Sequence, residues 1–159
     1  GNGEPGWLDG KGNSARFNGP MGIVYAPDGF LYVADTDNHR IRKLSLTGEV
    51  STFAGSGQSG SRDDQGLKAE FKGPVGLAFD TVGNLYLSDR LNQRIRRIDS
   101  EGKVTSVAGT GERGYEDKIG DEGALSFPYD LEVRGDKLYI ADYSNHVIRW
   151  LQLPARSDS

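Results

Sequence analysis

The chain has 159 residues, a formal net charge of −4 and no cysteine. This length suits one domain with a hydrophobic core of its own. The acidic balance disfavours a nucleic-acid-binding role, which usually comes with a basic excess. Without cysteine there are no disulfides and no thiolate metal sites. No apolar run is long enough to span a bilayer, so no membrane partner is expected.

The sequence repeats itself at a fixed step. Pro20, Pro74 and Pro128 lie 54 residues apart (74 − 20 and 128 − 74), and similar strings follow each of them. A fixed period of this size is typical of an array of one supersecondary unit. Residues present in all copies are therefore expected to hold the unit together, and positions where the copies differ become the functional candidates.

Each copy begins with a Gly-rich loop and a short segment that we align on a phenylalanine, at Phe17, Phe71 and Phe127. The apolar period then becomes two, which predicts β-strands. The strands expected in the first copy are GIVYA, LYVAD, RIRKLSL and VSTFAG, separated by turn sequences such as PDG and TGE. In the third copy Pro154 and a polar tail stand where the fourth strand should be. This predicts about eleven strands, four per copy except in the last.

Short antiparallel strands with no long helix between them argue against a parallel βαβ sheet and favour an all-β fold, the β-propeller. The three Gly-rich loops match G-x-G-x-x-G. That pattern binds dinucleotides only between a strand and a helix of a βαβ unit. We therefore interpret the loops as turns and predict no cofactor.

The strings LYVADTDNHRIRKL, LYLSDRLNQRIRRI and LYIADYSNHVIRWL resemble NHL repeats, named for an Asn-His-Leu signature. The resemblance covers nearly the whole chain, although Gln93 replaces the signature His in the second copy and the Gly-rich insert lengthens the period. NHL repeats form the blades of propellers, typically about six to a ring. The resemblance implies a propeller of four-stranded antiparallel blades, with three blades per chain, half of a six-bladed ring. The blades are expected at about 1–57, 58–111 and 112–153, followed by a flexible tail at 154–159.

Half a ring would expose the apolar faces of its first and last sheets, which monomers rarely leave uncovered. A homodimer with two-fold symmetry would close the ring and cover both faces. Three alternatives remain open: a fragment of a longer chain with further repeats, a row of three blades that aggregates, and an engineered version of a longer propeller.

Several polar residues recur and are interpreted as scaffold. An Asp ends the second strand of each copy, and we expect it to cap the following turn while an Asn three residues later adopts the left-handed conformation. A recurring Arg is expected to pair with acids on the adjacent blade. These residues are Asp35, Asp89 and Asp142, Asn38, Asn92 and Asn145, and Arg42, Arg96 and Arg149. His39 and His146 share one position and suggest zinc. Because Gln93 interrupts them, we expect a structural hydrogen bond to the next blade and no metal.

The functional candidates are positions where the copies diverge. Tyr129 and Asp130 replace the Met-Gly and Val-Gly pairs of the other copies, and Arg90 and Tyr143 follow the recurring Asp. Binding residues of propellers lie in loops at one face, so we predict these four as ligand contacts. Trp7 and Tyr115 share a position in the Gly-rich loops and are predicted interface anchors.

No nucleophile, base and orienting group occur together in a recognised motif. Proteins with NHL repeats serve mainly as interaction platforms, so the resemblance implies a non-catalytic binding module or scaffold with a protein or peptide partner. A minority of such propellers are metal-dependent lyases or lactonases. The alternative is therefore a metal-assisted lyase or hydrolase that uses channel acids such as Asp130.

Overall fold

The computed structural model describes residues 1–118 and 123–154, and within them every regular element is a β-strand or a single turn of 3-10 helix. All strands of the named sheets pair antiparallel. The all-β, antiparallel prediction is confirmed. No described helix is long and apolar enough to cross a membrane.

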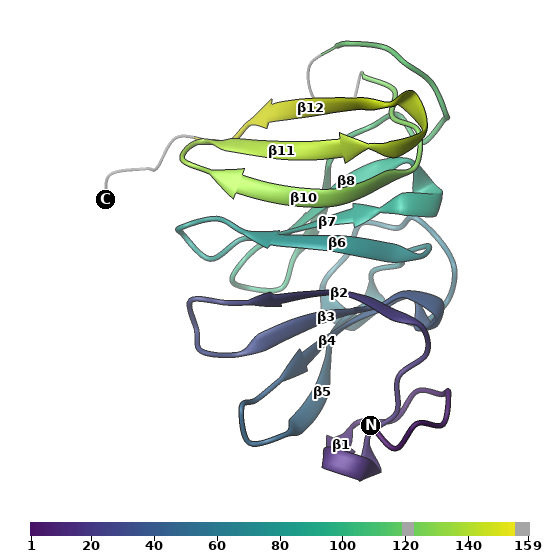
Figure 1. Ribbon diagram of the computed structural model, residues 1–159, viewed down its shortest axis with the longest axis vertical. Coiled ribbons are helices and arrows are strands. Elements are labelled where there is room, and N and C mark those ends of the chain that lie inside the picture. Colours follow the sequence, from purple (N-terminus) through teal and green to yellow (C-terminus); the bar gives the residue numbers. More distant parts are fainter. Residues whose placement is uncertain (119–122, 155–159) are drawn as a thin grey trace.

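The strands form three sheets, each built from consecutive segments of the chain and stacked one above another (Figure 1). The first sheet contains β1 (Gly10–Lys11), β2 (Pro20–Tyr25), β3 (Leu31–Asp35), β4 (Arg40–Leu44) and β5 (Glu49–Ala54). The second contains β6 (Pro74–Phe79), β7 (Leu85–Asp89), β8 (Arg94–Ile98) and β9 (Val104–Ala108). The third contains β10 (Pro128–Arg134), β11 (Lys137–Asp142) and β12 (Val147–Gln152).

The predicted strands are all present in the described part of the chain, and β1 is an addition. Its two residues pair with Val50 and Glu49 of β5. They lie in a Gly-rich loop that has no alternating pattern, so periodicity did not reveal them. The 3-10 turns are η1 (Gly12–Ser14), η2 (Thr36–Asn38), η3 (Gly66–Lys68), η4 (Arg90–Asn92) and η6 (Tyr143–Asn145). Of the predicted tail, only Pro154 is among the described residues.

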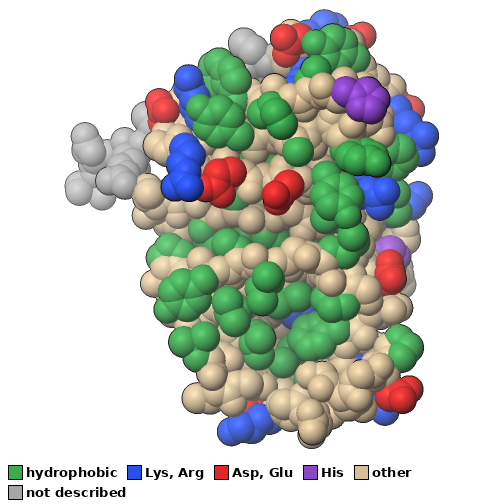
Figure 2. Space-filling model, in the orientation of Figure 1, with side chains coloured by type: hydrophobic (Ala, Val, Ile, Leu, Met, Phe, Trp, Pro, Cys, Tyr) green, Lys and Arg blue, Asp and Glu red, His purple; other side chains and the backbone are tan. Residues whose placement is uncertain are grey.

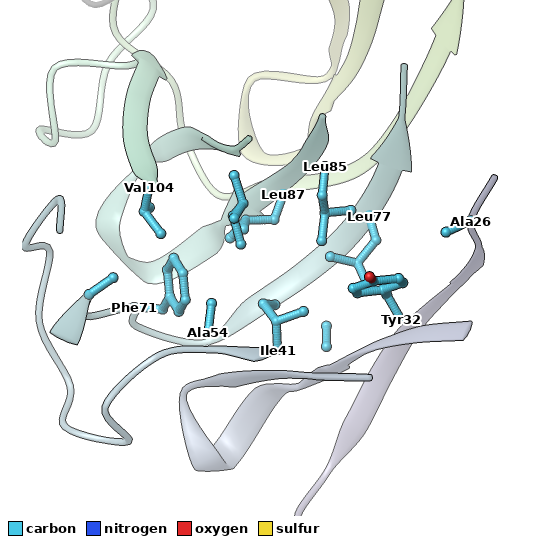
Figure 3. Packing of buried hydrophobic residues seen from close by; sticks show 12 residues of the cluster. Ala26, Tyr32, Ile41, Ala54, Phe71, Leu77, Leu85, Leu87 and Val104 are labelled. Carbon is cyan, nitrogen blue, oxygen red and sulfur yellow. The ribbon is translucent and has the colours of Figure 1, made fainter. Parts of the chain in front are cut away.

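Two hydrophobic cores fill the spaces between the sheets. Figure 3 shows the first core, where Tyr32 and Ile41 of the first sheet meet Leu77 and Leu87 of the second. The other core joins the second and third sheets through residues such as Tyr86 and Leu138. The middle sheet is therefore covered on both faces, which explains why its β7 is buried along its whole length.

Two glycines allow the first strands of neighbouring sheets to lie side by side, with β6 between β2 and β10. A Cβ atom on Gly22 would collide with the carbonyl oxygen of Val75, and one on Gly76 with that of Tyr129. Asp130 occupies this repeat position in the third sheet and is exposed.

The structure corrects the alignment of the third copy on Phe127. Leu125 takes the place of Phe17 and Phe71, since each of the three forms the same isolated parallel bridge to its Gly-rich loop. Phe127 instead occupies the place of Gly19 and Gly73, and all three have positive φ: 51° for Phe127, 55° for Gly19 and 62° for Gly73.

The recurring Asp, Asn and Arg form one buried network in each copy, but not with the predicted partners. In the first copy Asp35 accepts hydrogen bonds from the Asn18 backbone N–H at 2.8 Å, the Asn38 side chain at 2.8 Å and Arg42 at 2.7 Å. The left-handed conformation falls on His39, Gln93 and His146, not on the Asn residues, because the Asn closes the 3-10 turn and the next residue re-enters a strand.

Arg42 also binds Asp9 at 2.8 Å, so both of its acidic partners belong to its own repeat. The prediction that it pairs with acids on the adjacent blade was wrong. The hydrogen bond to the next blade that was predicted for the His39 position is present in the first two copies. His39 accepts the Gly73 N–H at 3.2 Å through Nδ1, and Gln93 accepts the Phe127 N–H at 2.6 Å through Oε1.

Candidate functional site

Three of the four predicted ligand contacts, Arg90, Tyr129 and Tyr143, lie close together. The Arg90 Cζ atom lies 5.5 Å from the ring centre of Tyr129 and 5.3 Å from that of Phe127. The Tyr129 and Tyr143 rings are 5.9 Å apart and tilted by 44°. We call Arg90, Phe127, Tyr129 and Tyr143 the Arg90 cluster.

The scaffold network explains why these side chains meet. Arg90 begins η4 directly after Asp89, and Tyr143 begins η6 directly after Asp142. Because both buried Asp residues end equivalent strands of adjacent sheets, the residues after them emerge at the same end of the stack. Tyr129 is the second residue of β10, which pairs with β11 at Pro128–Asp142. The cluster therefore stands on sheet ends that are fixed by buried hydrogen bonds.

Asp130, the fourth predicted contact, lies next to the cluster on β10. Its side chain is exposed, and its carboxylate accepts the Leu131 N–H at 3.0 Å. The Tyr129 hydroxyl lies 4.0 Å from the Met21 sulfur, so the cluster also reaches the first sheet. No ion pair of Arg90 or Asp130 is found among the described residues.

Two members of this surface were missed from the sequence. Phe127 belongs to the cluster, and the Cζ atom of Arg113 also lies 4.0 Å from the centre of its ring. A phenylalanine with positive φ is an unusual, strained choice, and such strain gathers at functional sites. The signal was available, because the first two copies have Gly-Pro where the third has Phe-Pro.

The predicted interface anchors lie in the Gly-rich loops and contact residues outside the Arg90 cluster. Trp7 donates its indole N–H to Thr52 Oγ1 at 3.0 Å, and Arg40 stacks on its ring at 3.8 Å. The ring centre of Tyr115 lies 5.6 Å from the Arg149 Cζ atom. Both rings are about half exposed or more, at 49% and 62%, so their role as anchors stays a prediction.

The Arg90 cluster offers flat stacking surfaces, one guanidinium and one neighbouring carboxylate. Such a surface suits aromatic, peptide or charged groups of a partner. In the described ranges, 1–118 and 123–154, no three His, Asp or Glu side chains are grouped so that they could hold a metal ion.

Comparison with known proteins places the chain in a family. Residues 17–44 match the NHL repeat. NHL repeat-containing protein 2 of Bos taurus is 31% identical over 165 residues, covering 92% of this chain and 22% of that protein. The chain is therefore an NHL-repeat protein. Protein SUPPRESSOR OF QUENCHING 1, chloroplastic, of Arabidopsis thaliana is 39% identical over 92 residues, or 57% of this chain and 9% of that protein.

A solved structure with the same fold comes from Bacteroides thetaiotaomicron, a protein of unknown function. It is 29% identical with a TM-score of 0.73, over 82% of this NHL-repeat chain and 34% of its own. The structural neighbours are propeller-like, in keeping with the stacked sheets. The chain thus spans less than a quarter of each of these two curated relatives and about a third of the solved structure.

Proposed function

We propose that this NHL-repeat chain is a non-catalytic interaction module whose Arg90 cluster binds a peptide or protein segment. The observation that carries the proposal is the position of the cluster. Its side chains project from sheet ends held by buried networks, while Tyr143 remains 63% exposed. A rigid platform with exposed aromatic rings loses little entropy when it binds, which is how binding surfaces gain affinity.

The chemistry of the cluster indicates the kind of segment. Aromatic and Arg side chains are enriched at the energetic centres of protein interfaces. The Arg90 guanidinium suits a carboxylate of the partner, and Asp130 suits a basic group beside it. A segment with an aromatic residue flanked by charges fits this arrangement best.

A peptide array followed by titration calorimetry tests the proposal. We expect Tyr129→Ala and Tyr143→Ala each to weaken the best peptide about tenfold or more, the effect of losing an interface anchor. The matched control is Leu46→Ala, at an exposed side chain in the turn between β4 and β5, which should leave the affinity unchanged. Equal affinities for all three variants would contradict the proposal.

The same proposal includes closure of a ring. The three sheets would be blades of a six-bladed propeller, completed by a second copy of this chain. Exposed hydrophobic side chains on the two outer faces support it. On the first sheet these are Ile23 and Tyr25, 62% and 60% exposed, and on the third Ile148 and Trp150, 71% and 57% exposed. Because side chains alternate along a strand, these residues lie on the face of their sheet that points away from the core, whereas Val24 and Leu151 point into the core.

The contact between two copies cannot have the same packing everywhere as the contact between adjacent sheets within one chain. Charged side chains form a row over β10, whereas the surface over β2 is largely hydrophobic (Figure 2). The row consists of Asp130, Glu132 and Arg134, whereas the first two of these positions are Gly76 and Ala78 in β6. A second copy would therefore pack closely on Ile148 and Trp150 and stand further away beside β10.

A further inference from the structure

A cavity of about 460 Å³ lies between the first and second sheets, within the size range of small-molecule sites. It surrounds the first residue of β7, Leu85, whereas Arg90 follows the last residue of the same strand. The cavity is therefore at the opposite end of the strands from the Arg90 cluster. The β2–β3 turn contributes Asp28 to its lining, and the turn after β8 contributes Asp99. We call it the Asp99 cavity.

Three aromatic side chains line the Asp99 cavity. Tyr32 contacts Phe53 and Phe79 edge to face, with ring centres 4.9 and 5.0 Å apart. Tyr32 is buried, while the two phenylalanines are only partly buried at the edge of the first core. Tyr32 and Ala26 mark the end of that core from which the cavity opens (Figure 3). A ligand in the cavity would thus meet aromatic rings.

The two phenylalanines have no aromatic counterparts between the second and third sheets. One repeat later, Val107 takes the place of Phe53 and Val133 takes the place of Phe79, and both valines pack against the second core. Since valines fill the equivalent contact between adjacent sheets, joining two sheets does not require the aromatic rings. The aromatic lining is a point where the copies diverge, like the residues of the Arg90 cluster.

An ion pair in the lining balances its own charge. Asp28 accepts hydrogen bonds from the Lys43 ammonium group at 2.8 Å and from the Tyr32 hydroxyl at 2.9 Å. Burial acts to raise the pKa of Asp28, but the hydrogen bonds from Lys43 and Tyr32 outweigh it, and the pKa lies below its usual value. Asp28 is therefore charged at neutral pH, and it neutralises Lys43.

Asp99 adds a carboxylate that has no cationic partner in the described part of the chain. Its Oδ1 atom accepts the backbone N–H groups of Glu101 and Lys103 at 3.0 and 2.9 Å. In the first sheet Ser45 has the same repeat position, and its hydroxyl accepts the Glu49 N–H at 3.0 Å. One oxygen atom is thus enough for the turn. The Oδ2 atom of Asp99 accepts no hydrogen bond from the residues that the structure describes, so the cavity has a net negative charge.

We propose that the Asp99 cavity binds a small molecule that carries a protonated amine on an aromatic body, an arylalkylamine. The aromatic body packs against Phe53 and Phe79, and the ammonium group donates a hydrogen bond to Oδ2 of Asp99. Aromatic rings offer a large apolar contact and also attract cations to their faces. The negative charge of the cavity repels an anionic ligand. This site goes beyond the proposed function, because it shares no residue with the Arg90 cluster.

Tryptamine is the probe, tryptophol is its uncharged counterpart and indolepropionate its anionic counterpart. Amide NMR spectra of the isotope-labelled protein follow each titration. We expect saturable shifts at Gly83, Asp99 and Ser100, which line the cavity. Tryptamine should bind about tenfold more tightly than tryptophol, the effect of a hydrogen bond to a charged group, and indolepropionate should bind more weakly than tryptophol.

The variants test the two parts of the site separately. Asp99→Asn keeps the acceptor for the turn and removes the charge, so tryptamine should lose its advantage while tryptophol binds as before. Phe53→Val and Phe79→Val introduce the residues of the next copy and should weaken both ligands about threefold or more, because aromatic contact is lost. Asp37→Asn is the matched control, since it removes an exposed carboxylate beyond the far end of β3, and it should leave all affinities unchanged.

Three outcomes would overturn the proposal: equal binding of tryptamine and tryptophol, an unchanged advantage of tryptamine in Asp99→Asn, or shifts confined to the Arg90 cluster. Each comparison is a ratio of two affinities measured on the same folded variant, so a loss of stability cannot imitate the expected result. An Arg90 cluster that binds no peptide would contradict the proposed function and leave the result of this titration unaffected.

Discussion

At the scale of single residues, the distance between neighbouring sheets depends on one glycine per contact. Gly22 and Gly76 face backbone carbonyl groups of the next sheet, which cannot rotate away as a side chain could. Neither glycine has positive φ, so it is space and not backbone conformation that requires glycine here.

We predict that Gly76→Ala lowers the free energy of unfolding by about 1–3 kcal/mol, the usual cost of overpacking. The methyl group would press on the Tyr129 carbonyl and force β6 and β10 apart. Urea denaturation measures the change. Asp130→Ala is the control at the same repeat position, where no described sheet packs, and it should change stability by less than about 0.5 kcal/mol. Equal effects of the two substitutions would refute the steric argument.

Tyr86 should make the protein sensitive to alkali. Burial, followed by the charge of Asp80, raises the pKa of Tyr86 to about 12, and its hydroxyl donates to Asp80 at 3.2 Å. The unfolded chain loses this proton near pH 10, whereas the folded chain keeps it until about 12. Stability is therefore fully present below pH 10 and falls by about 2–3 kcal/mol as the pH rises to 12.

Thermal or urea unfolding between pH 9 and 12 measures this dependence. Tyr86→Phe should flatten the curve. An equally steep curve for Tyr86→Phe would show that another group is responsible.

At the scale of elements, the Asp-Asn-Arg network joins each strand end to its Gly-rich loop. The network is tightest where an outer strand covers it. Arg42 and Arg96 have no exposed side-chain surface and lie 2.7 and 2.6 Å from their strand-end Asp. Arg149, whose sheet has no outer strand among the described residues, is 10% exposed and lies 3.4 Å from Asp142.

We therefore predict that Arg96→Met costs about 3–5 kcal/mol of stability, because it leaves buried Asp89 without its charged partner. Arg149→Met should cost about half as much, because water already reaches that network. Chemical denaturation of the two variants gives the comparison directly. Equal losses would mean that the outer strand does not shield the network.

The elements show what a sequence alone can reveal. Alternating apolar residues between Gly and Asn turns located β2 to β12, because each strand has a core face. β1 was not predicted, because its two residues, Gly10 and Lys11, show no alternation of apolar and polar side chains. The partnership of Arg42 with Asp9 was not predicted, because Asp9 lies 33 residues away in a loop and the periodicity of the strands does not indicate where loop side chains lie. Comparing the copies found Arg90, Tyr129 and Tyr143, but a shifted alignment concealed Phe127.

At the scale of the whole molecule, the stack has two outer faces of different character. The first sheet presents Ile23 and Tyr25, while the third combines Ile148 and Trp150 with the charged row of β10. Repeat arrays commonly end on a more polar face. Whether a second copy covers these faces depends on the balance between the apolar half of the third sheet and its charged half.

Sedimentation equilibrium decides the matter, since one chain has a mass of 17.3 kDa. We predict a mass of about twice that value, as expected for a dimer with two-fold symmetry, the commonest arrangement among oligomers.

Trp150→Asp should shift the protein toward monomer, because it places a charge on the apolar half of the contact. Leu46→Asp, at an exposed leucine in the turn between β4 and β5, is the matched control and should leave the mass unchanged. Asp130→Gly should tighten the dimer, since it restores the close approach that Gly22 and Gly76 allow. A monomeric mass for both the parent protein and Asp130→Gly would exclude closure by a second copy.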